Sequence, residues 1–266
     1  MRLTIGNYTA VFLLYLMGFL PFALLLCLIF VHGPLIALLS FIALVLSILL
    51  QADKLLLNWL RAIPLNPGSP LHPLCQNLSF RIGTGQVRLF QTSVFPFNFY
   101  FLDSIFGAPS LIIGNTILER FSATEIKTLV FFSLMQVRDQ KAWYRTLITA
   151  GLIIFNWPLF LSRLLPNSSF LKSETFHFLS NLCFPFLALK YHLLPAQWSQ
   201  DLIEGHRKEA SGFIDHQKQM DAVLSTIENL EAIHPSNAMK FILEGVAITP
   251  NAHPNAVFLL MKSSKG

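Results

Sequence analysis

Few residues in this chain are spaced in the way that metal-binding or catalytic side chains usually are. It has eight histidines, and no two of them lie four residues apart, the helical spacing that brings two imidazoles to one metal ion. None of its three cysteines forms a C-x-x-C pair, which argues against a thiolate metal site or a disulfide framework. Glu204 and His206 remain as weak candidate metal ligands. The alternative is that Glu204 and Glu209 lie on a solvated face.

The composition indicates a membrane protein. Of the 266 residues, 53% are apolar and only 12% are charged, and the mean hydropathy is +0.55. A charged share this low is about half that of a soluble domain. The formal charge of +5 fits cationic loops that orient membrane helices. Because the chain has neither a basic helix nor an RNA-binding motif, we expect the lipid bilayer as a partner and no nucleic acid.

Four apolar runs are each near the length that a helix needs to cross a bilayer. They span residues 8–31, 34–50, 146–165 and 176–194. The first two carry no charge and are joined by a short turn at His32, so they predict a transmembrane helical hairpin. Asn156 interrupts the third run and Pro185 the fourth, so this pair could cross the membrane or form a re-entrant hairpin instead.

Lysine and arginine near the four runs predict the orientation. They flank the outer ends of both pairs, as at Lys54, Lys141 and Arg145, and are sparse at His32 and in the loop of residues 166–175. Both termini and the central region are therefore expected on the cytoplasmic side of the membrane.

These features predict an α+β membrane protein with four transmembrane helices and a cytoplasmic domain. The expected divisions are an N-terminal transmembrane hairpin (1–54), a juxtamembrane linker (55–78), the first part of the cytoplasmic domain (79–145), the second hairpin (146–195), and the helical C-terminal part of the domain (196–266).

The central region carries the clearest local signals. Alternating polarity over residues 86–91 and a short apolar run at 111–114 predict two strands. Ser122 and Glu125 form an S-x-x-E capping box, which predicts the start of an apolar helix that continues to about Met135.

The order of these parts resembles that of the HtpX-type membrane zinc metallopeptidases. Residues 96–101 look like a diverged copy of the family's P-N-A-F-A-T-G segment, and residues 111–118 fit its edge strand and following turn. Residues 121–136 (FSATEIKTLVFFSLMQ) fit the helix that carries its H-E-x-x-H motif, and Ala252-His253-Pro254 resembles its T-H-P segment. The resemblance implies a zincin-like domain.

The chain departs from this family at the residues that perform the chemistry. Phe132 and Gln136 stand at the positions of the two zinc-binding histidines, and Ser133 stands at that of the catalytic glutamate. Phenylalanine offers no donor to a metal, and serine cannot act as a carboxylate base. The family's third ligand would fall near Glu204, where the register is open between Glu204, His206 and Arg207.

The resemblance therefore implies a pseudoenzyme of the bacterial inner membrane, with a role in protein quality control and no cofactor. Its expected partners are unfolded or membrane proteins, or an active homologous protease. A retained groove could bind extended peptides by strand addition. The candidate groove residues are Asn98, Leu111, Ile112, Ile113 and Gly114. One alternative is an active zinc-dependent metalloendopeptidase with rearranged ligands, and another is a structural membrane protein without a client.

Overall fold

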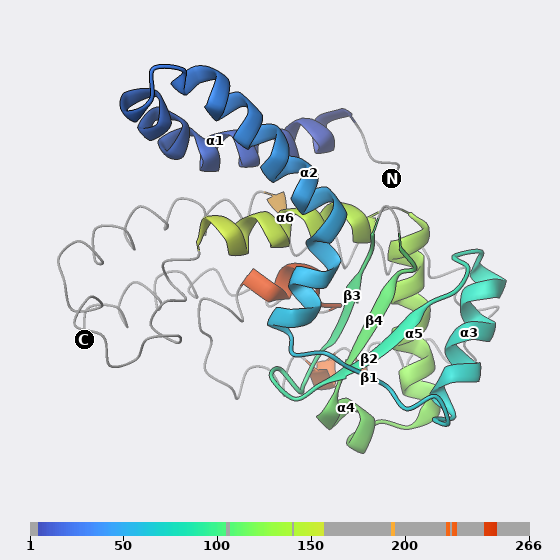
Figure 1. Cartoon of the computed structure of the whole chain (residues 1–266). Helices are drawn as coiled ribbons and strands as arrows, with labels where there is room; N and C mark the ends of the chain where they lie inside the picture. Colours follow the sequence, from blue (N-terminus) through green and yellow to red (C-terminus); the bar gives the residue numbers. More distant parts are fainter. Residues whose placement is uncertain are drawn as a thin grey trace, which may run out of the picture.

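The computed structural model describes residues 5–104, 107–139, 141–156, 193–194, 222–223, 225–227 and 242–248. Within them, a helical hairpin at the N-terminus stands on a mixed helix-and-sheet domain (Figure 1). Residues 242–248, drawn in red, lie beside the sheet although they are distant from it in sequence.

In the described chain, helices precede and follow a central group of strands. They are α1 (Ile5–Ile29), α2 (Gly33–Trp59), β1 (Ile63–Pro64), α3 (Leu71–Ile82), β2 (Arg88–Thr92), β3 (Phe99–Leu102), β4 (Ser110–Gly114), α4 (Asn115–Arg120), α5 (Ala123–Arg138), α6 (Lys141–Phe155) and the 3-10 turn η2 (Glu244–Val246).

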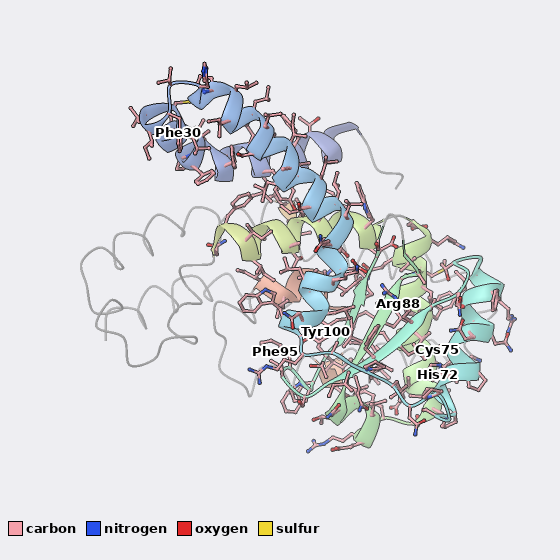
Figure 2. All side chains as sticks on the ribbon, in the orientation of Figure 1. Phe30, His72, Cys75, Arg88, Phe95 and Tyr100 are labelled. Atoms are coloured by element: carbon pink, nitrogen blue, oxygen red, sulfur yellow. The ribbon has the colours of Figure 1, made fainter. Side chains whose placement is uncertain are left out.

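The N-terminal hairpin matches the first expected pair of membrane helices. Both α1 and α2 are long and apolar enough to cross a membrane, and few of their described side chains are buried. Figure 2 shows these side chains projecting from the two helices, with Phe30 near the far end of the hairpin. Gly33 permits the tight connection, because a Cβ atom there would lie 2.6 Å from the carbonyl oxygen of Leu26.

The hairpin is joined to the domain through both of its helices. The hydroxyl of Tyr15 on α1 donates a hydrogen bond of 2.7 Å to the carbonyl of Leu147 on α6. At the end of α2, Leu56 is fully buried in the domain. One turn earlier, the carboxylate of Asp53 forms an ion pair with Arg88 on β2, with 2.8 Å between the nitrogen and the oxygen. The last turns of α2 therefore belong to the core of the domain.

The four strands form one sheet in the order β1-β2-β4-β3. β2 and β4 are parallel, whereas β1 and β3 run antiparallel to their neighbours. Helices α3 and α5 cover one face, and α6 and the end of α2 cover the other. Side chains alternate between these faces, with Leu111 and Ile113 toward α5 and Ile112 toward α6.

The position of β4 corrects the expectation that residues 111–114 form an edge strand. β4 pairs with β2 on one side and with β3 on the other, and all of its residues are buried. Its backbone donors and acceptors are therefore used within the sheet, and no peptide can be added there. A proline at Ile113 would disrupt the sheet itself instead of testing a binding edge.

The local predictions in the central region are confirmed. β2 and β4 lie where the two strands are expected, and α5 begins at the predicted capping box. There the Ser122 N–H donates to the Glu125 carboxylate at 2.7 Å, and the Glu125 N–H donates to the Ser122 hydroxyl at 3.4 Å.

Three other regions differ from expectation or lie wholly or partly outside the described residues. Residues 55–78, expected as a linker, contain the end of α2 and most of α3, whose Cys75 and Leu78 are buried in the core. The third apolar run begins within α6, which is packed between the hairpin and the sheet. Apart from residues 193–194, the fourth run lies outside the described residues.

The close approach at the end of β4 yields a testable prediction. A Cβ atom at Gly114 would overlap the carbonyl oxygen of Pro96 and lie 2.9 Å from that of Asn98, and both atoms belong to the backbone. Gly114→Ala must therefore break the 3.0 Å hydrogen bond from its N–H to Asn98. We expect a loss of about 3 kcal/mol in the free energy of unfolding in detergent. Gly68→Ala, where the nearest atom is 3.6 Å away, is the control. Equal stability of the two variants would contradict the β3–β4 geometry.

Candidate functional site

Two of the three degenerate motif positions on α5 are used for packing. Phe132 is 1% exposed, and its ring lies edge-on to that of Phe131 with centroids 5.2 Å apart. The hydroxyl of Ser133 is also buried and donates a 2.9 Å hydrogen bond to the carbonyl of Leu129, one turn earlier on the same helix. Phe132 has no donor or acceptor, and the hydroxyl hydrogen of Ser133 is used within its own helix.

The third position, Gln136, makes a different kind of contact. Its side-chain oxygen accepts a 2.7 Å hydrogen bond from Nη1 of Arg145, in the second turn of α6. Both residues are almost fully buried, at 2% and 4% exposure. A buried guanidinium is uncommon, because desolvating an unpaired charge costs several kcal/mol. The surroundings of Arg145 must therefore compensate for the water that it has lost.

The other nitrogens of Arg145 are held by backbone carbonyls from the far end of the chain. Nε donates to Gly245 at 2.6 Å, and Nη2 donates to Ala247 at 2.8 Å. The guanidinium carbon also lies 4.8 Å from the ring centroid of Phe101 on β3, within the range of a cation–π interaction. We call Arg145 with Gln136, Phe101, Gly245 and Ala247 the arginine clamp, since it joins α5, α6, β3 and residues 245–247.

The clamp holds its positive charge with neutral groups. Burial lowers the pKa of Arg145 to about 9, which is still above neutral pH, so the guanidinium remains charged in the folded protein. In the part of the chain that the structure describes, its three acceptors are amide oxygens, and no carboxylate is paired with it. Such an arrangement favours one particular geometry, because displacing any acceptor leaves part of a buried charge unsolvated.

Residues 245–248 also occupy the outer edge of β3. The Ile248 N–H donates a 2.9 Å hydrogen bond to the carbonyl of Phe99, and Ala247 forms a β-bridge with Tyr100. Asn98, a candidate groove residue, is used nearby, because its side-chain oxygen accepts a 2.7 Å hydrogen bond from the Phe99 N–H. The chain therefore supplies its own partner for the sheet edge nearest to α5.

The apolar side chains of residues 242–248 are buried against the domain. Four of the segment's large apolar side chains are at most 1% exposed, and burying each one contributes about 1.5–3 kcal/mol. They are Ile242, Leu243, Val246 and Ile248. A foreign peptide would have to replace these contacts as well as the hydrogen bonds of the clamp.

The structure thus brings together only some of the residues expected from the sequence. Gln136 and Asn98 both lie close to the β3 edge, whereas Leu111, Ile112, Ile113 and Gly114 are in the interior of the sheet. Glu204 and His206 lie outside the described residues. Within the described residues, no group of three histidine, cysteine, aspartate or glutamate side chains could hold a metal ion.

Sequence reasoning missed Arg145 as a site residue and used it only as a flanking charge for membrane orientation. A signal was present, because Gln136 and Arg145 are polar residues at the ends of two apolar helices that are close in sequence. Two polar side chains in such a position are expected to satisfy each other when both helices are buried. The carbonyl partners about 100 residues later left no signal, since any residue supplies a carbonyl.

Comparison with known proteins adds no assignment. No protein-family model, curated protein or solved structure matches this chain. The resemblance to the HtpX-type peptidases therefore stays a prediction from the motifs quoted above.

The clamp predicts the effect of removing the guanidinium. Arg145→Met keeps an apolar stem but leaves the side-chain oxygen of Gln136 and two carbonyls without their donor. We expect the free energy of unfolding in detergent to fall by about 3 kcal/mol, since each buried unpaired group costs 1–3 kcal/mol. Arg145→Lys should recover only part of this loss, because an ammonium lacks the planar fork that reaches three acceptors. The control is Arg138→Met at the exposed end of α5, expected to change stability by less than about 1 kcal/mol. Equal effects of Arg145→Met and Arg138→Met would contradict the clamp.

Proposed function

We propose that this chain is a catalytically inactive, HtpX-like pseudopeptidase of the membrane that acts as a binding or regulatory module for other polypeptides. The observation that carries the proposal is the use of all three motif positions on α5 for internal contacts. Phe132 and Ser133 are packed, and Gln136 accepts a hydrogen bond from Arg145.

The chemistry of zinc peptidases explains why this observation argues against catalysis. Those enzymes need two imidazoles on one helix face and a carboxylate that activates the metal-bound water. Here the corresponding helix offers a benzyl ring, a hydroxyl that donates to its own helix, and an amide oxygen bound to a cation. The guanidinium of Arg145 would also repel a divalent cation placed beside Gln136.

The proposal also covers the type of domain, the number of membrane helices and the membrane in which they lie. It describes a cytoplasmic zincin-like domain with four membrane helices in a bacterial inner membrane. In support, α5 packs beneath a mixed sheet, as a zincin helix would, and the first two helices are suitable for membrane insertion.

The partners are proposed to bind through the hairpin and not through β4. Among the described residues, every exposed large hydrophobic side chain except Ile63 and Phe80 belongs to α1, α2 or the turn between them. Such a surface suits the bilayer first, and then apolar segments of unfolded or membrane proteins or of an active relative.

The first experiment measures zinc and proteolysis. Protein purified without added metal, and again after incubation with zinc, should contain no stoichiometric zinc and should not cleave an unfolded polypeptide. Zinc that is lost on Glu204→Ala or His206→Ala, together with cleavage that a chelator abolishes, would defeat the proposal. That result would establish the rearranged metalloendopeptidase.

The second experiment looks for partners in native membranes. A photocrosslinking amino acid at Leu39, which is 58% exposed on α2, should yield adducts with other polypeptides. The same group at Phe80, 66% exposed on α3, controls for random collision. If both positions yield only lipid adducts or the same background, the chain is a structural membrane protein without a client.

A further inference from the structure

We infer that the outer edge of β3 is a peptide-docking site whose resident ligand is this chain's own residues 242–248. We also infer that the site selects glycine at the position of Gly245. The inference rests on the proposed function, because it treats the domain as a peptide-binding frame without catalysis. It adds a second binding site, separate from the hairpin surface, together with its occupant and the class of peptide that fits.

The backbone of the segment is recognised at two places. Its N–H at Ile248 pairs with the Phe99 carbonyl, which is how an added strand binds to a sheet edge. Its carbonyls at Gly245 and Ala247 accept hydrogen bonds from Arg145. Arg145 thus acts as a positioning residue that holds two alternate carbonyls of the docked segment.

The side chains of the segment enter both layers of the domain. Val246 and Ala247 pack in the cluster formed with α2 and α6, whereas Ile248 packs in the cluster formed with α3 and α5. In Figure 1 the red segment lies below α6 and beside β3, where the lower part of α2 crosses it in the view. The site therefore suits an apolar segment with a turn followed by extended residues, as in η2 and the bridge at Ala247.

The requirement for glycine follows from the contacts at Gly245. A Cβ atom there would overlap the hydroxyl oxygen of Thr149 on α6 and lie 2.8 Å from a methyl carbon of Leu194. The backbone cannot move away freely, because the Gly245 carbonyl is held by Nε of Arg145 at 2.6 Å. Thr149 is fully buried and β-branched, so its side chain has little freedom to turn aside.

The experiment supplies the segment as a separate peptide. Gly245→Val in the full chain should displace the resident segment while leaving the docking site intact. A fluorescent peptide with the sequence of residues 242–249 (ILEGVAIT) should then bind the variant in detergent at least tenfold more tightly than it binds the wild-type protein. The matched control is the same peptide with valine in place of its glycine, which should not bind either protein.

Two results would overturn the inference. One is a folded Gly245→Val protein that binds neither peptide, and the other is equal binding of both peptides. Hydrogen exchange of the wild-type protein provides an independent test if the variant does not fold. Residues 242–248 should exchange faster than residues 110–114 of β4, as a separately released unit. If the amide hydrogens of both segments exchange at the same rate, residues 242–248 are a permanent element of the core. That result would defeat the inference.

Zinc content measured on the same samples separates the two proposals. A zinc-free, folded protein that fails the peptide tests would contradict only the docking site. A protein that holds zinc and cleaves polypeptides would contradict the proposed function, whatever the peptide result.

Discussion

The buried guanidinium of Arg145 imposes the strictest constraint on this domain. A cation that has lost its water must find acceptors at fixed distances, and here they come from α5 and from residues 245 and 247, with the ring of Phe101 on β3 beside them. The relative positions of α5, α6, the β3 edge and the C-terminal segment are therefore coupled. Replacing the cation by an apolar group would remove the cost of desolvation, but it would also remove this coupling.

The clamp links α5 to a later segment of the chain without a metal ion. In a zinc peptidase the metal ion connects the active-site helix to a ligand from a later segment of the chain. In the proposed pseudopeptidase, the guanidinium makes an equivalent connection from Gln136 on α5 to residues 245–247. Under that proposal, an organic cation with directional donors would have the structural role that the metal has in a peptidase, and Phe132 is packed on the same helix.

The sequence predicted the elements whose signals are local. Alternation and apolar runs located β2 and β4, and the Ser122–Glu125 pair located the start of α5. Strand order is set by contacts between distant residues, so β4 was wrongly expected at an edge. Because residues 64–73 are rich in proline, this region was expected to be a linker. The helical spacing of Leu71, Cys75, Leu78 and Ile82 does predict a helix with one buried face. Two of the three hydrogen-bond acceptors of Arg145 are backbone carbonyls about 100 residues away, and no side-chain pattern marks them.

The most direct test of this account is a double-mutant cycle between Arg145 and Gln136, measured by unfolding in detergent. Arg145→Met, Gln136→Leu and the double variant separate the hydrogen bond from the packing of each residue. The account predicts a coupling energy of about 1.5–3 kcal/mol, the range for a buried hydrogen bond to a charged group. The double variant should therefore lose less stability than the two single variants lose when their losses are added. Losses that add to within about 0.5 kcal/mol would show that the two side chains act independently, and would contradict the clamp as the organising interaction.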